Sequence, residues 1–447
     1  MKDSADVIIV GAGIAGLTAA EMLSNSGLQI IILEARDRIG GRILTEFDPK
    51  AGFPIELGAE FIHGAPPNLL HRLQRGRVPI REIKGEPWCS EQRRLSPCGD
   101  FWERTERILE QMRYRKSSDS SFKSFLQGPK LRRFAAEDRT RATHYVEGFN
   151  AARAHEISVN SLVRSMRADE KIDGDRQFRV ARGYDALLHS VHRRLAPDRV
   201  ATQLNTVVST IGWRQGQVKI VAQTPTRRLR TYIAARALIT LPLGVLQARP
   251  RQAGAVQFQP ALPEKERALQ KLRMGKVMRV SLRFRRRFWD ALRPGKGRKS
   301  LNKMTFLFSR DELFPTWWTA FPERWPILTG WSPSWWAQKL IGQPHSLIIR
   351  EAVGALARIL PVKRNDLANL LHSAYLHDWQ SDPFARGAFS YALVGGDNAP
   401  AVLAKPVQNT LFFAGEATAT DGHTGTVHGA IASAERAAGE LLKSLTV

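Results

Sequence analysis

The feature that most constrains the fold is a glycine-rich turn between a short apolar run and a segment with helical spacing. Asp6 to Val10 is apolar and rich in β-branched residues, and the stretch from Leu17 to Gly27 has helical periodicity. The turn between them, Gly11 to Gly16, carries three glycines in a Gly-x-Gly-x-x-Gly pattern. This order predicts a strand, a tight turn and a helix.

A second apolar run, Leu28 to Leu33, ends in Glu34, where the second strand of a βαβ unit carries its acidic residue. In such a unit Gly11 permits the turn, Gly13 lets backbone N–H groups approach a pyrophosphate, and Gly16 allows helix and strand to pack. Glu34 is placed to accept hydrogen bonds from ribose hydroxyls. The pattern predicts a Rossmann-like dinucleotide site, without separating FAD from NAD.

The string after Glu34 separates these two cofactors. Glu34-Ala35-Arg36-Asp-Arg-Ile-Gly-Gly41-Arg42 resembles the second signature of a flavoprotein group that includes amine oxidases, phytoene desaturases and protoporphyrinogen oxidases. The resemblance implies that the paired glycines approach the flavin side of the pyrophosphate and that Arg36 and Arg42 offer donor forks to phosphate. We therefore expect FAD.

A further signature lies near the other end of the chain. Thr410 to Glu416 is an apolar strand that runs into Gly-Glu, and a helix begins near Gly425. This string resembles the C-terminal FAD motif of flavin amine oxidases, a family that includes monoamine oxidases, polyamine oxidases and histone lysine demethylases. By that resemblance Glu416 contacts the pyrophosphate–ribitol region, and the helix N-terminus faces the pyrimidine end of the flavin, where its dipole stabilises negative charge.

Segments in family order extend the resemblance over nearly the whole chain, namely 57–64, 240–246, 315–318 and 382–391. The cofactor contacts that it implies are Gly11, Gly13, Ala15, Gly16, Glu34, Ala35, Arg36, Gly41, Arg42, Gly58, Ala59, Glu60, Val208, Trp379, Gly415, Glu416, Gly425, Thr426 and Val427. Ala388 stands where monoamine oxidases carry their flavin-linking cysteine. We therefore expect the FAD to be non-covalent.

The same resemblance implies an α/β fold with a discontinuous Rossmann-like FAD-binding domain. We expect this domain to comprise 1–77, 180–255 and 385–447. Residues 78–179 and 256–384 would form a second, α+β substrate domain built on a mixed sheet. Within 78–179 the sequence predicts helices over 101–115 and 138–154.

The sequence departs from the family at the position of the lysine that lies near flavin N5. Flavin amine oxidases usually carry a lysine that holds a water against flavin N5, and Arg279 occupies the position in register with it. Lys276 is three residues away, and an odd separation on a strand turns a side chain to the opposite face. Arg279 cannot become neutral, which weakens the expectation of fast re-oxidation by O2.

The substrate pocket is expected to be partly aromatic. Phe389 would form one wall, while Thr426 stands where a second aromatic residue is common. His63 and Glu60 lie in a loop expected to reach the flavin, where the alternative is a purely structural hydrogen-bonding role. The catalytic candidates are therefore Arg279, Phe389, Thr426, His63 and Glu60, and the resemblance also puts Trp317 and Trp318 in the pocket.

The net charge indicates which kinds of macromolecular partner are compatible with the chain. The net charge of +25 is compatible with a nucleic acid or an anionic surface. The basic residues are dispersed, with the densest clusters at 227–230, 283–287 and 293–303, and no recognition module gathers them. We therefore favour a solvated basic surface. The oligomeric state is left without a prediction.

Other features bound the environment. No apolar stretch is long enough to span a membrane, no signal-peptide pattern opens the chain, and no metal-ligand spacing is present. Cys89 and Cys98 are expected to do nothing special, which fits a reducing cytoplasm.

The working hypothesis is FAD-dependent oxidation of a primary or secondary amine, monoamine or polyamine, to an imine and then an aldehyde, with O2 reduced to H2O2. The expected partners are thus a small-molecule amine and O2. The enzymatic alternatives are an L-amino-acid oxidase and an amine dehydrogenase or desaturase that uses another electron acceptor. The non-enzymatic alternative is a basic flavoprotein that binds nucleic acid or membrane.

Overall fold

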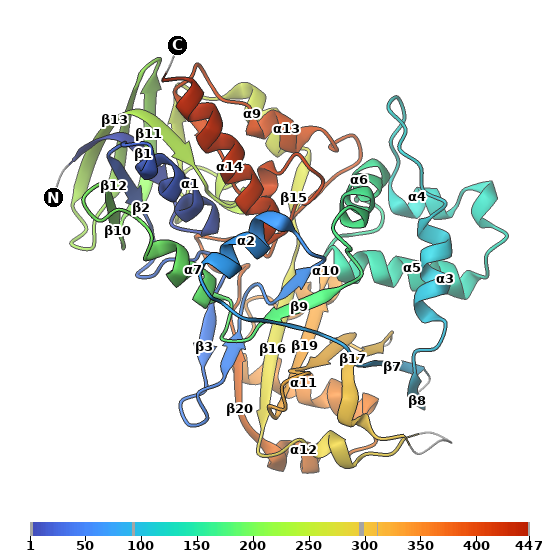
Figure 1. Ribbon diagram of the computed structural model, residues 1–447. Helices are drawn as coiled ribbons and strands as arrows, with labels where there is room; N and C mark the ends of the chain where they lie inside the picture. The colour runs from blue at the N-terminus through green and yellow to red at the C-terminus, as the bar shows by residue number, and fades with distance from the viewer. Residues whose placement is uncertain (1–2, 92–93, 295–298, 311, 446–447) are drawn as a thin grey trace.

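The computed structural model describes residues 3–91, 94–294, 299–310 and 312–445 (Figure 1). Both termini lie beside a large mixed sheet, a second sheet lies below it in the view, and the helices α3–α6 form a cluster on one side. The chain crosses between these parts several times.

The first sheet has the strand order β10-β2-β1-β13-β12-β11-β14, and β22 also pairs with β13. The strands span Ser4–Val10 (β1), Ile30–Leu33 (β2), Val200–Gln203 (β10), Val207–Arg214 (β11), Gln217–Gln223 (β12), Leu229–Ile239 (β13), Gln257–Gln259 (β14) and Leu411–Phe413 (β22). The strands β10, β2, β1, β13 and β22 are parallel, whereas β11 to β13 form an antiparallel meander.

Apolar residues on both faces of β1 and β2 explain why this sheet is covered on both sides. Val7 to Val10 and Ile30 to Leu33 are all buried, as expected for strands in the middle of a parallel sheet. On one face pack α1 (Ile14–Asn25), α7 (Asp185–His192) and α14 (Val427–Lys443), with α2 (Pro67–Arg75) against α14. The opposite face packs against residues of β11 and β12. Segments from opposite ends of the chain thus share one core.

The second sheet has the order β20-β16-β19-β18-β17-β7-β8 and is antiparallel except between β17 and β7. Its strands span Glu86–Glu91 (β7), Arg94–Pro97 (β8), Val277–Phe284 (β16), Met304–Ser309 (β17), Thr316–Thr319 (β18), Ile327–Pro333 (β19) and Leu371–Leu376 (β20). The helices α10 (Ser334–Gln338), α11 (His345–Ile359) and α12 (Arg364–Leu370) adjoin it.

Smaller elements join the two sheets. They are β3 (Thr45–Phe47), β4 (Pro54–Glu56), β5 (Phe61–His63), β6 (Ile80–Glu82), β9 (Gln177–Val180), α8 (Leu243–Leu246), α9 (Pro263–Leu269), β15 (Leu272–Met274), β21 (Ser390–Ala392) and α13 (Ala399–Ala404). The α/β class and the mixed second sheet agree with the sequence-based expectation. The domain boundaries remain a prediction, and β14, which we expected in the substrate domain, adds to the edge of the first sheet.

The helices of 78–179 are shorter than the sequence pattern predicts. They span Phe101–Leu109 (α3), Phe122–Leu126 (α4), Ala136–Phe149 (α5) and Val159–Glu170 (α6). The predicted helix over 138–154 ends at Phe149 because Ala151 has a φ of 48°, outside the helical region.

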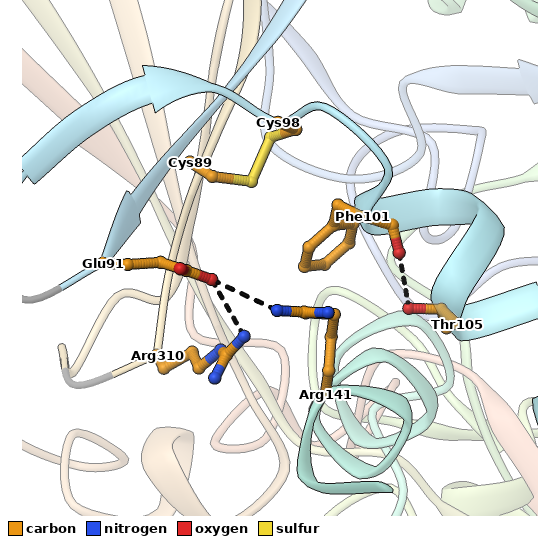
Figure 2. Close-up of a disulfide and its surroundings, with 7 residues drawn as sticks. All are labelled: Cys89, Glu91, Cys98, Phe101, Thr105, Arg141 and Arg310. Atoms are coloured by element: carbon orange, nitrogen blue, oxygen red, sulfur yellow. Dashed lines mark hydrogen bonds and ion pairs between the residues drawn. A yellow bond between two sulfur atoms is a disulfide. The ribbon is translucent and has the colours of Figure 1, made fainter. Parts of the chain in front are cut away.

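The expectation that the two cysteines do nothing special is wrong. Cys89, on β7, and Cys98, just after β8, form a disulfide across this hairpin (Figure 2). Beside it the carboxylate of Glu91 accepts hydrogen bonds from Arg141 and Arg310. Disulfides persist mainly in oxidising compartments. A cytoplasmic location remains a prediction, but the two cysteines no longer support it because they are not free thiols.

Candidate active site

One cavity of about 310 Å³ lies where the two sheets meet, and its lining contains all the predicted site residues except Gly16 and Trp317. Val10 and Leu33 line it from the carboxyl ends of β1 and β2, where open α/β sheets bind their ligands. Arg279 of β16, Trp318 of β18 and Trp331 of β19 line it from the second sheet. The two sequence signatures thus meet around a single space.

The glycine turn has the geometry that a pyrophosphate requires. Gly11 has a φ of 107°, and a Cβ at Gly16 would lie 2.0 Å from the Gly11 carbonyl oxygen, so the strand and α1 are in backbone contact there. At Gly13 a Cβ would meet no described atom within 4 Å, although the residue lines the cavity. The turn therefore presents an open backbone surface at the N-terminus of α1, where an anion is stabilised.

Glu34 is buried at the end of β2, with 4% of its surface exposed. Its Oε2 accepts a hydrogen bond of 2.8 Å from the Ala12 N–H, and its Oε1 accepts one of 3.0 Å from the Arg36 N–H. A carboxylate has about four acceptor positions. Glu34 is thus fixed by the turn and keeps acceptor capacity for the hydroxyls of a ribose.

The two arginines of the N-terminal signature are bound to acidic residues. Arg36 donates to both oxygens of Asp382 at 2.8 and 2.9 Å. Burial alone would raise the pKa of Asp382, but hydrogen bonds from His377 and Arg36 outweigh it and hold that pKa well below its usual value. Arg42 donates to Glu416 and to the Ala388 carbonyl, both at 2.8 Å. Their donor forks are therefore partly occupied by the protein itself.

Glu416 joins the two signatures. Besides Arg42, it accepts hydrogen bonds from the Ser390 hydroxyl at 2.6 Å and from the Gly425 N–H at 2.9 Å. Immediately after Gly425, the Thr426 hydroxyl caps α14 by accepting from the Gly429 N–H at 2.9 Å. Glu416 thus holds the N-terminus of α14 against the cavity.

A buried network of charges and hydrogen bonds surrounds Glu60. Arg279, 6% exposed, donates to the Glu60 carboxylate and to the Gly58 carbonyl, the latter at 2.7 Å. Arg179 and the indole N–H of Trp318 donate to the same carboxylate at 2.7 and 3.0 Å. Among the described residues, nothing accepts from Arg279 Nε. One donor of a permanent cation is therefore left for a water or ligand.

The register of β16 turns Arg279 toward this cavity. Lys276, just before the strand, is exposed and does not line it. The Arg279 guanidinium also lies over the Trp318 ring, 5.4 Å from its centroid. The residue in the usual lysine position is therefore held in place by a carboxylate, a carbonyl and a ring.

Burial shifts the pKa values of three titratable residues around the cavity toward their neutral forms. Burial lowers the pKa of His63, although Asp169 opposes the shift. Burial, with a smaller contribution from His423, lowers the pKa of His428 to about 3. Behind Glu60, burial raises the pKa of Glu56 to about 8, against hydrogen bonds from Thr45 and the Tyr184 N–H. Both histidines and Glu56 are uncharged at neutral pH.

Aromatic rings form the wall opposite the glycine turn. Phe61 meets Trp318 edge-on with 5.3 Å between ring centroids. Trp331 and Phe389 are nearly parallel, at 6.5 Å and 13°. Trp317 corrects our expectation: its ring lies in the core of the second sheet, against Gly330, because neighbours on a strand face opposite sides. The sequence interpretation did not name Phe61 as a wall residue or Arg179 and Glu56 as supports, and it left Trp331 open between the pocket wall and ordinary core packing.

The cavity fits FAD by three independent tests: the open glycine turn, the fixed acidic residue at the end of β2, and the capped helix N-terminus beside Glu416. Ala388 lines it where a linking cysteine would stand. Both cysteines of the chain are in the disulfide, so no thiol remains for a covalent link.

The described residues contain neither a candidate metal site nor a candidate membrane span. No group of three or more His, Cys, Asp or Glu side chains in 3–91, 94–294, 299–310 and 312–445 is arranged to hold a metal ion. No helix in that part of the chain is long and apolar enough to cross a membrane.

Comparison with known proteins agrees with this geometry. The sequence matches the flavin containing amine oxidoreductase family over residues 14–83 and 100–442. The chain therefore belongs to the flavin containing amine oxidoreductases.

Individual relatives fall into two groups. Polyamine oxidase 2 of Arabidopsis thaliana is 27% identical, over 97% of this chain and 87% of the relative. Lysine-specific histone demethylase 2 of Homo sapiens is 26% identical over 92% of this chain, which spans 50% of that protein.

Solved structures show the same fold. A putrescine oxidase bound to putrescine superposes with a TM-score of 0.80 at 21% identity, covering 98% of this chain and 99% of the other. Cyclohexylamine oxidase from Brevibacterium oxydans IH-35A has a TM-score of 0.79 at 19% identity, with 99% and 100% covered.

Proposed function

We propose that this protein is an amine oxidase that converts a primary or secondary amine into an imine and passes the two electrons to O2. The observation that carries the proposal is the meeting of a dinucleotide turn and an aromatic wall around one cavity, with Arg279 between them. For a primary amine the balance is R–CH2–NH2 + O2 + H2O giving R–CHO, NH3 and H2O2. Water enters in the hydrolysis of the imine.

FAD, when bound, supplies the hydride acceptor and returns the electrons to O2. Gly13, Glu34 and the residues beside Glu416 would hold its phosphates and ribose without a covalent bond. Thr426 and Val427 begin α14 at the cavity, where the helix dipole favours negative charge. The chain therefore provides the charge complement that a reduced cofactor needs.

The aromatic wall favours the neutral form of the amine substrate. Trp331, Phe389 and Phe61 give an apolar space in which the neutral amine is favoured over its ammonium form. Neutral His63 and His428 add no charge to this space. The chain's contribution is thus positioning and exclusion of water, and no acid or base residue is required.

Arg279 would act as a fixed cation that holds a water through its Nε. The guanidinium cannot swing away without breaking its hydrogen bonds to Glu60 and to the Gly58 carbonyl, which would leave a buried cation unpaired. Whether O2 is the acceptor depends on this residue, and an electron carrier is the alternative.

The experiment is a paired assay of the purified yellow protein. Anaerobic bleaching of the flavin by amines, with peroxide formed on admission of air, would support the proposal. Bleaching without peroxide would identify a dehydrogenase, and bleaching by L-amino acids alone would identify an amino-acid oxidase. A protein that cannot take up FAD would refute the proposal entirely.

A further inference from the structure

All the carboxylates that line the cavity are already bound. Glu34 accepts from two backbone N–H groups, Glu60 from two arginines and Trp318, and Glu416 from Arg42, Ser390 and Gly425. Among the described lining residues there is no other Asp or Glu. The cavity therefore offers no free carboxylate to a second ammonium group of a substrate.

The other charged residues of the lining are arginines. Arg36, Arg42 and Arg279 line the cavity, and Arg179 lies directly behind Glu60. Outside the lining, Asp169 lies 3.5 Å from His423 with a side chain that is 37% exposed to solvent, and Glu147 accepts from the Ala154 N–H and the Trp335 indole. An ammonium group held inside the cavity, beyond the reacting amine, would thus be desolvated without a free carboxylate in the lining.

Aromatic rings in contact lead from the surface to this space. Trp102 and Phe149 are 39% and 46% exposed. Tyr145 lies between them, 5.6 Å from Trp102 and 5.7 Å from Phe149 by ring centroids. Phe149 then meets His63 edge-on at 5.3 Å, and His63 lines the cavity. We call these four residues, Trp102, Tyr145, Phe149 and His63, the aromatic row.

We propose that the enzyme selects monoamines whose far end is apolar, aralkyl or long alkyl, and discriminates against diamines and polyamines. This inference rests on the proposed amine oxidation and specifies its substrate class. An apolar end gains contact with the wall and the aromatic row. A second ammonium loses hydration and meets arginines instead of a carboxylate.

The test compares pentylamine with cadaverine, which differs by a second terminal amine, and with phenethylamine, using anaerobic flavin reduction by the holoenzyme. We expect kcat/KM for cadaverine to be lower than for pentylamine by about 30-fold or more, because an unpaired ammonium is buried. Phenethylamine should at least equal pentylamine. Equal or better reduction by cadaverine would overturn the inference and leave amine oxidation intact. Failure of every amine to reduce the flavin would refute both.

A matched set of variants tests the cause. Phe149→Glu places a carboxylate beside His63, Phe149→Gln removes the ring without adding charge, and Phe47→Glu adds the same charge at a residue 49% exposed outside the cavity. Phe149→Glu should raise the cadaverine-to-pentylamine ratio by about tenfold, whereas the other two should not. Equal ratios in all three variants would overturn the explanation by missing carboxylates.

Discussion

Arg42 donates a 2.8 Å hydrogen bond to Glu416 across a separation of 374 residues, and this bond fastens the N-terminal signature to the C-terminal one. Both residues line the cavity, and Glu416 also holds Ser390 and Gly425. The cofactor region is therefore built from both ends of the chain, which this ion pair joins at the cavity.

Glu416→Gln should weaken FAD binding, because the substitution removes the charge that Arg42 pairs with and turns one acceptor into a donor facing N–H groups. A hydrogen bond to a charged group contributes about 1.5–3 kcal/mol, so we expect the FAD dissociation constant to rise roughly 10- to 100-fold. Fluorescence titration of the apoprotein with FAD measures this change. Glu440→Gln, at a partly exposed pair with Arg436, is the control and should bind FAD normally. Unchanged FAD affinity in Glu416→Gln would contradict the account of this ion pair.

Gly16→Ala and Gly439→Ala should have opposite effects on stability, although both lie in helices. At Gly16 the new methyl group would lie 2.0 Å from the Gly11 carbonyl, so α1 must move away from β1. At Gly439, in α14, it would meet no described atom within 4 Å. Thermal unfolding should give a large loss for Gly16→Ala and a gain of about 0.5–1 kcal/mol for Gly439→Ala. A stable Gly16→Ala variant that binds FAD normally would show that this close contact is not required.

Arg279→Met should slow flavin reduction by about 10- to 100-fold, because it removes the cation at the cavity and leaves Glu60 with one arginine fewer. Stopped-flow reduction by an amine measures this step, and mixing the reduced enzyme with air measures re-oxidation. Lys276→Met, which alters an exposed lysine three residues away, serves as the control and should match the unchanged enzyme. If both variants behaved alike, Arg279 would have no special role.

Glu56 should make stability depend on pH. Burial raises its pKa to about 8, so the folded protein binds a proton that the unfolded chain releases above its ordinary pKa of 4.5. The stability contributed by this proton is therefore lost as pH rises from about 4.5 to 8, at most on the order of a few kcal/mol. Glu56→Gln should flatten this decline, measured by denaturant unfolding at several pH values. Glu46→Gln, exposed on the adjoining β3, should leave the decline unchanged, and an equal decline in both variants would contradict the assignment.

The cofactor-binding part of the site could be predicted from the sequence because its motifs are local. Gly11 to Glu34 specifies a strand, turn, helix and strand whose geometry follows from short-range sterics. The partners that hold the site in place come from distant segments, and no local rule links Arg179 to Glu60 or Glu56 to Tyr184. Such pairs depend on how the distant segments pack in the folded protein, so the three-dimensional structure is needed to identify them.

Two errors have specific physical origins. Trp317 and Trp318 are neighbours on one strand, so only one can face the cavity, and alternation alone predicts that limit. The Cys89–Cys98 disulfide was not expected because two cysteines in a long chain do not form a disulfide framework, whereas a single bond across a hairpin needs only two. Both features are local, one along a single strand and the other across a single hairpin.

The most direct test of the central claim, that one cavity holds both FAD and the amine being oxidised, is anaerobic reduction of the holoenzyme by benzylamine and by its α-dideuterated form. The account predicts that the amine bleaches the bound flavin in a single turnover and that deuterium slows this step several-fold, because the α C–H bond breaks there. No bleaching by either form, or by any other amine, would contradict it.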